Sequence, residues 1–145
     1  MRLQSDETYV LDLCDKVLGE KAERQKRFDF LLGDLHKDGF SRTKLPVDAY
    51  YPSYQLVIEY KESQHTVSHA IFDKQDVTTV SGVHRGEQRL IYDQRRATEL
   101  PLHGIKLISI SYDLFKNDNQ HKIVRNPEAD LLKVKEVLKA VGEGI

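Results

Sequence analysis

The stretch LPVDAYYPSYQLVIEYKE, residues 45–62, contains an apolar run that ends in charged side chains. Residues 56–58, LVI, predict a buried β-strand, because a short apolar run bounded by turn residues is typical of a central strand. Glu59 and Lys61 follow directly. Side chains of a strand alternate between its two faces, so these two charges point the same way. They mark either the end of the strand in solvent or a site of chemistry.

A second strand precedes this one. Residues 46–51, PVDAYY, predict a strand that begins at a proline, and Pro52 with Ser53 predicts the turn between the two strands. If the strands pair across this turn, Asp48 lies at the same end as Glu59. Two carboxylates and the Lys61 ammonium then meet at one edge of a sheet.

Carboxylate oxygens are ligands that Mg²⁺ prefers, and this ion commonly binds one or two carboxylates while keeping several waters. We therefore expect Asp48 and Glu59 to hold Mg²⁺, for which Mn²⁺ can substitute. Lys61 would orient or deprotonate an attacking water, or stabilise charge on a phosphate. This donor set predicts metal-assisted phosphodiester hydrolysis. Taken alone, an E-x-K triplet also fits a solvated strand end.

The rest of the chain predicts an α/β protein with a mixed sheet flanked by helices. A helical crossover between the third and fourth strands predicts that these two strands are parallel. The predicted elements are a helix over 5–18 capped by Ser5 or Asp6 and ended by Gly19, strands over 27–32, 46–51 and 54–61, a helix over 87–100 ended by Pro101 and Gly104, a strand over 105–115, and a helix from Pro127 capped by Asn126.

The bulk properties indicate one domain over residues 1–145, large enough for a hydrophobic core. The net charge of −1 gives no global signal for nucleic acid, although local basic patches can still bind phosphate. No apolar run could span a bilayer, and the first ten residues lack a signal peptide's apolar core, so we expect a cytoplasmic protein. The single cysteine, Cys14, falls in a helical apolar pattern and predicts a buried packing role.

The motifs Pro46-Val47-Asp48 and Glu59-Tyr60-Lys61, within this order of elements, resemble the PD-(D/E)xK nuclease superfamily. The likeness is closer to its small restriction-endonuclease-like and very-short-patch-repair-type branch. The features of that branch read here as LVIEYKESQH, as YDQRR with Asp93 and Arg96, and as HGIKLISI with Gly104, so the resemblance covers roughly residues 5–115. The branch often has an acid or a glycine where Lys61 stands, whereas the wider superfamily has lysine. The resemblance implies a restriction-endonuclease-like α-β-β-β-α-β core.

The superfamily usually adds an acid from the first helix. Glu7 shares the inward face of the 5–18 helix, being three residues before Val10 and four before Leu11, and it is our candidate third metal ligand. The alternatives are that Glu7 is a first-turn acid complementing the helix dipole, or that Glu20 completes the site. The resemblance also implies a place near the scissile phosphate for His65, whose alternative reading is a polar loop histidine. Gln64 beside it would orient substrate or water.

A basic cluster opens the 87–100 helix. Guanidinium groups and the N–H groups of a helix N-terminus both suit phosphate, so nucleic-acid contacts are predicted from four residues: Arg85, Gln88, Arg89 and Arg96. The alternative is a solvated helix face, with the arginines paired to acids such as Glu87 and Asp93. Asp93 and Arg96, at i and i+3, can pair with each other.

The leading hypothesis is thus a Mg²⁺-dependent endonuclease that cuts DNA, with RNA left open. A non-catalytic nucleic-acid- or protein-binding module on the same fold is the second hypothesis, and a metal hydrolase acting on another phosphodiester is the third. The chain contains no obvious module for reading base sequence. A homodimer is a possible arrangement, because cutting both strands of a duplex often takes two copies of a small nuclease.

Overall fold

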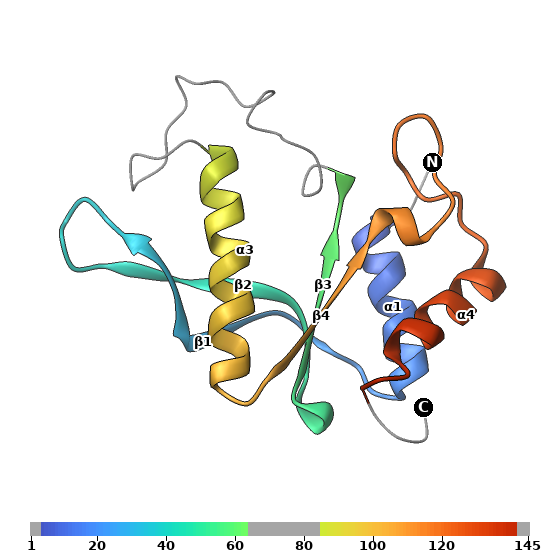
Figure 1. Cartoon of the computed structure of the whole chain (residues 1–145), viewed down its shortest axis with the longest axis horizontal. Coiled ribbons are helices and arrows are strands. Elements are labelled where there is room, and N and C mark those ends of the chain that lie inside the picture. The colour runs from blue at the N-terminus through green and yellow to red at the C-terminus, as the bar shows by residue number, and fades with distance from the viewer. Residues whose placement is uncertain (1–3, 64–84, 142–145) are drawn as a thin grey trace.

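The computed structural model describes residues 4–63 and 85–141 as an α/β structure with a four-stranded mixed sheet and three helices (Figure 1). Two short 3₁₀ turns, η1 and η2, complete the described elements. In chain order these are α1 (Asp6–Leu18), β1 (Glu23–Leu35), β2 (Arg42–Tyr51), η1 (Pro52–Tyr54), β3 (Leu56–Lys61), α3 (Arg85–Leu102), β4 (Lys106–Ser111), η2 (Tyr112–Leu114) and α4 (Pro127–Leu138).

The strands lie in the order β1-β2-β3-β4. The first three form an antiparallel meander, and β3 pairs with β4 in parallel, as predicted from the helical segment between them. The parallel register places Glu59 opposite Ser109 and Lys61 opposite Ser111. The chain therefore has β3 at an interior position of the sheet, with a neighbour on each side.

Helices cover both faces of this sheet, with α1 and α4 on one side and α3 on the other (Figure 1). Alternation along β3 divides its side chains between the two sides. Leu56, Ile58 and Tyr60 join the core cluster made with α1 and α4, whereas Val57 joins the cluster made with Leu100 of α3. Glu59 follows the alternation of Val57, so it faces α3.

Both predicted ends of α1 and the predicted start of α4 are confirmed. The Ser5 hydroxyl accepts a hydrogen bond from the Thr8 N–H at 3.1 Å, and Gly19 ends α1 with a left-handed φ of 68°. Asn126 caps α4, with Pro127 in its first turn. Cys14 is buried as predicted, and this burial raises the pKa of its thiol to about 12.

Several predicted boundaries are wrong. Strand β2 begins at Arg42 rather than Pro46, β3 begins at Leu56 because the η1 turn takes up residues 52–54, α3 begins at Arg85, and α4 ends at Leu138. Strand β1 spans Glu23–Leu35 rather than 27–32, because its first residues alternate between exposed and half-buried positions and so give little hydrophobic signal. Pro101 lies inside α3, which ends at Leu102. The end of the helix is closed by a hydrogen bond of 3.0 Å from the Ile105 N–H to the Leu100 carbonyl, which requires the left-handed φ of Gly104. Strand β4 ends at Ser111, where the η2 turn begins.

Candidate functional site

Asp48 and Glu59 lie side by side where the pairing of β2 with β3 stops. The last paired residues are Ala49 and Ile58, so Asp48 and Glu59 are the next positions along each strand. At these positions the backbone N–H groups donate to side-chain carboxylates instead of to backbone carbonyls of the neighbouring strand. The Asp48 N–H donates to Glu59 Oε2 at 2.6 Å, and the Tyr60 N–H donates to Asp48 Oδ2 at 2.8 Å. This exchange confirms that the two predicted acids meet.

Glu59 is a buried carboxyl, with 5% of its surface exposed. Burial, and then the charge of Asp48, raise the pKa of Glu59 from 4.5 to about 7. The hydrogen bond from the Asp48 N–H and the charges of Arg96 and Lys61 oppose this rise. When two carboxylates lie side by side in a buried position, their like charges make it unfavourable for both to be ionised. A cation bound between them would remove this repulsion.

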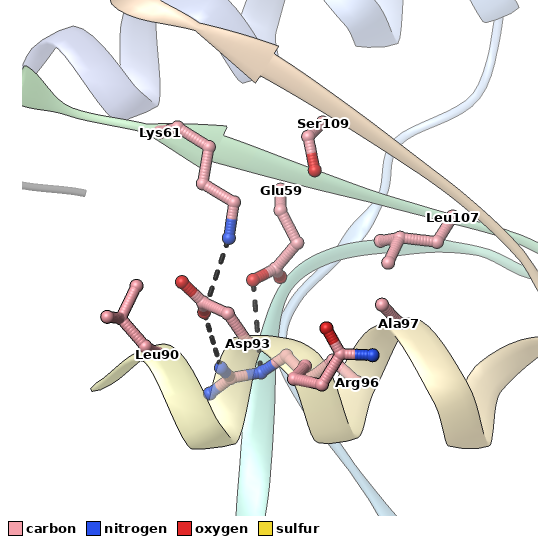
Figure 2. Close-up of a pocket in the computed structure, with 9 residues that line it drawn as sticks. Glu59, Lys61, Leu90, Asp93, Arg96, Ala97, Leu107 and Ser109 are labelled. Atoms are coloured by element: carbon pink, nitrogen blue, oxygen red, sulfur yellow. Dashed lines mark hydrogen bonds and ion pairs between the residues drawn. The ribbon is translucent and has the colours of Figure 1, made fainter. Parts of the chain in front are cut away.

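Lys61 reaches across from β3 to α3, as Figure 2 shows, and its Nζ is 3.2 Å from Asp93 Oδ1. Arg96 Nη1 donates to the same Asp93 oxygen at 3.0 Å, which confirms the predicted i, i+3 pair. Arg96 Nε is also 3.8 Å from Glu59 Oε1. Four charges thus form a continuous series: Lys61, Asp93, Arg96 and Glu59.

These side chains border a hollow of about 350 Å³ between the sheet and α3 (Figure 2). Its walls are mixed in chemistry. They are formed by Glu59, Lys61, Leu90, Asp93, Gln94, Arg96, Ala97, Leu107 and Ser109. Sequence reasoning did not assign Ser109 to the site, although pairing the predicted third and fourth strands in parallel register would have placed it opposite Glu59.

The other predicted contacts on α3 are spread around the helix. Gln88 Nε2 donates to the Tyr92 hydroxyl at 3.1 Å, and that hydroxyl accepts from the Asp34 N–H of β1 at 3.0 Å. Gln88 therefore belongs to the side of α3 that packs on β1. Arg89 is half-buried, and Arg85 is the first residue of the helix. The predicted Gln64 and His65 lie outside the described residues.

The structure separates the two candidates for the third acid. Glu20 Oε1 accepts from the Ser53 N–H at 3.3 Å, in the turn that precedes β3. It therefore lies at the opposite end of β3 from Glu59. Glu7 is half-buried in the first turn of α1, and Figure 1 shows that end of α1 toward the same edge as the tip of β3. Glu7 stays a prediction, because α1 covers the other face of the sheet from α3 and the hollow beside Glu59 is lined by other residues.

The donor chemistry of Asp48 and Glu59 fits a hard divalent cation, since both supply carboxylate oxygens. Burial, and then the charge of Asp48, raise the pKa of Glu59, and a bound cation would offset both effects. Two protein carboxylates are enough for Mg²⁺, which keeps several waters. Within residues 4–63 and 85–141, no group of three or more histidine, cysteine, aspartate or glutamate side chains is placed to hold a metal.

No protein-family model, curated protein or solved structure matches this chain. None of the helices in the described part of the chain is both long and apolar enough to cross a membrane. The functional argument therefore depends on the site itself.

Proposed function

We propose that the protein is a metal-dependent nuclease that hydrolyses phosphodiester bonds in DNA, built on a restriction-endonuclease-like core. One observation carries this proposal. Asp48 and Glu59 are joined by hydrogen bonds to each other's strands, and Lys61 extends from the same strand as Glu59. The described helices and strands from α1 to β4 follow one another in the order that the resemblance to PD-(D/E)xK nucleases implies.

In this proposal Asp48 and Glu59 hold Mg²⁺ or Mn²⁺. Glu7 joins them as a third ligand only if it moves toward the pair, because the described residues contain no group of three carboxylates placed for a metal. A divalent cation supplies Lewis-acid stabilisation of the phosphate and a more acidic water. Glu59 releases its proton when the cation is present, because a nearby positive charge favours the carboxylate. Lys61 places a positive charge beside the reacting phosphate.

Nucleic acid would approach from the α3 side of the sheet, because Glu59 and Lys61 line the hollow there. The resemblance implies that His65 acts beside the scissile phosphate, and Gln64 would orient substrate or water there. Arg85 and Arg89 belong to the first turns of α3 and are the proposed phosphate contacts. Arg96 faces inward toward Glu59, so its proposed role is in the site itself.

A second function is favoured by one observation. Lys61 and Arg96 already have acidic partners in Asp93 and Glu59. This balance of charge suits a structural cluster, and the protein would then be a non-catalytic module that binds nucleic acid or another protein. A gel shift that is insensitive to metal, without cleavage of any substrate, supports this alternative.

The nuclease proposal predicts a specific loss of activity. Purified protein should cut plasmid, linear or branched DNA with Mg²⁺ or Mn²⁺, and RNA serves as the parallel substrate. Asp48→Ala and Lys61→Ala should each lower the rate by about 100-fold or more, the size typical of lost acid–base or electrostatic contributions.

Glu136→Ala and Lys139→Ala are matched controls, because these residues form an exposed ion pair at 3.0 Å at the C-terminal end of α4. Both controls should keep the wild-type rate. Cleavage that survives the Asp48 and Lys61 substitutions, or no cleavage of any substrate by the wild type, contradicts the proposal.

A further inference from the structure

Asp93 is one of the residues through which α3 contacts β3, the strand that carries Glu59 and Lys61. Its Oδ1 atom lies 3.2 Å from Lys61 Nζ and 3.0 Å from Arg96 Nη1, so one carboxylate oxygen bridges two cations. The three side chains are between 14% and 21% exposed. At this degree of burial, solvent screens the ion pairs less than it screens pairs at the surface.

The bridge is itself anchored to the sheet. Arg96 Nε donates to the Pro46 carbonyl at 3.0 Å, two residues before Asp48 on β2. The contacts therefore form one continuous circuit of hydrogen bonds and ion pairs, which runs from the Pro46 carbonyl on β2 through Arg96 and Asp93 to Lys61 on β3. Both ends of the circuit reach strands that carry the predicted metal ligands.

This circuit restricts Lys61 in a way that its own strand cannot. A lysine carries its charge on a flexible four-carbon stem, and holding it in one place costs conformational entropy. The Asp93 carboxylate supplies a fixed partner on a helix. Small displacements of a reacting group can lower the rate of an enzyme by about 100-fold, so a fixed ammonium has catalytic value.

We propose that Asp93 is a positioning residue that holds the Lys61 ammonium over the hollow beside Glu59, with Arg96 fixing Asp93 in turn. The catalytic part of this inference rests on the proposed nuclease function. Asp93 binds no metal in this account, because its bridging oxygen already faces two positive charges. Its effect on cleavage is exerted through Lys61.

The test compares Asp93→Asn, which keeps the shape but removes the charge, with Asp93→Glu, which keeps the charge. Glu99→Gln is the matched control: it makes the same chemical change on the same helix, and Glu99 lines a different hollow with Phe30 and Arg95. Asp93→Asn should lower kcat by about 10- to 100-fold with little change in KM. The kcat of Asp93→Glu should lie between the values of Asp93→Asn and the wild type. Glu99→Gln should match the wild type.

A second readout is independent of cleavage. Lysines are labelled by reductive ¹³C-methylation, and the Lys61 resonance is assigned by its loss in Lys61→Arg. It should shift in Asp93→Asn and stay in place in Glu99→Gln. Titration with Mn²⁺ should give the same affinity for wild type and Asp93→Asn, and thermal unfolding reports whether each variant is folded.

A Lys61 resonance that does not move in Asp93→Asn overturns the pairing, whatever the activity. An unchanged kcat overturns the positioning role, and a lost Mn²⁺ affinity shows that Asp93 acts at the metal instead. A wild type that cuts no nucleic acid contradicts the nuclease proposal, while the resonance still decides whether Asp93 holds Lys61.

Discussion

Glu59 is an ionisable carboxyl in the interior of the protein, where the charged form is ordinarily unfavourable. It is 5% exposed, and it receives a hydrogen bond from the Asp48 N–H. Removing a carboxylate from water is costly unless partners compensate. Here Arg96 lies 3.8 Å away and Asp48 adds a second negative charge, so the compensation is incomplete. A bound cation would complete it.

The raised pKa of Glu59 predicts a pH dependence of stability. Its pKa of about 7 in the folded protein exceeds the ordinary value of 4.5, so the folded state holds the proton more tightly than the unfolded state. The resulting stabilisation is fully present below pH 4.5 and is lost as the pH rises through 7. We expect the free energy of unfolding to fall between these pH values.

Glu59→Gln isolates this effect, because glutamine does not titrate and has nearly the same shape. Urea unfolding at several pH values should give a shallower decline for Glu59→Gln than for the wild type. Parallel pH profiles for the two proteins would show that Glu59 titrates normally. Measurements without divalent cations are required, since a bound cation favours the ionised carboxylate.

At the residue scale, the sequence predicted which strand residues meet, but it did not predict their partners on α3. Strand alternation and the turn at Pro52 were enough to predict that Asp48 and Glu59 meet, because both signals are local. The bond from Lys61 to Asp93 joins residues that are 32 positions apart, and it depends on how α3 packs on the sheet. No local pattern contains that information.

At the scale of elements, α3 positions the hollow, and its docking depends on a close approach to β1. A Cβ atom added at Gly33 would lie 3.1 Å from the Tyr92 hydroxyl and 3.2 Å from Leu45 Cδ2. Arg95 of α3 strengthens the same contact by donating to the Leu32 carbonyl at 2.9 Å and to Asp34 Oδ1 at 3.1 Å.

Gly33→Ala should therefore destabilise the protein by about 1–3 kcal/mol, the usual cost of overpacking a well-packed contact. Urea unfolding measures this change. Tyr92→Phe removes the atom nearest to the new methyl group, so the double variant should lose less stability than the sum of the two single changes. A Gly33→Ala protein with wild-type stability would show that α3 is not packed this tightly.

Elements with a strong local signal were predicted well, and those without one were not. α1 and α4 have capping residues and apolar stripes, so both ends of α1 and the start of α4 agree with prediction. β1 is longer than predicted because much of it pairs with β2 through polar, half-exposed residues. Its pairing is a tertiary property that residue type does not report.

At the scale of the whole molecule, the sheet has two faces with different roles. The face toward α1 and α4 carries a core cluster to which β3 contributes Leu56, Ile58 and Tyr60. The face toward α3 carries a smaller cluster and the charged hollow. The same strand thus stabilises the fold with alternate residues and presents Glu59 and Lys61 with the others. The α/β class followed from the order of elements alone, whereas the assignment of the two faces required the structure.

The central claim is that Asp48 and Glu59 hold a divalent cation. A crystal structure of the protein soaked in Mn²⁺, with anomalous diffraction recorded, tests it most directly. The account predicts an anomalous peak within bonding distance of a carboxylate oxygen of each residue, and its loss in Asp48→Asn. An absence of any peak at these two carboxylates, in a crystal where they are accessible to the ion, would contradict the account.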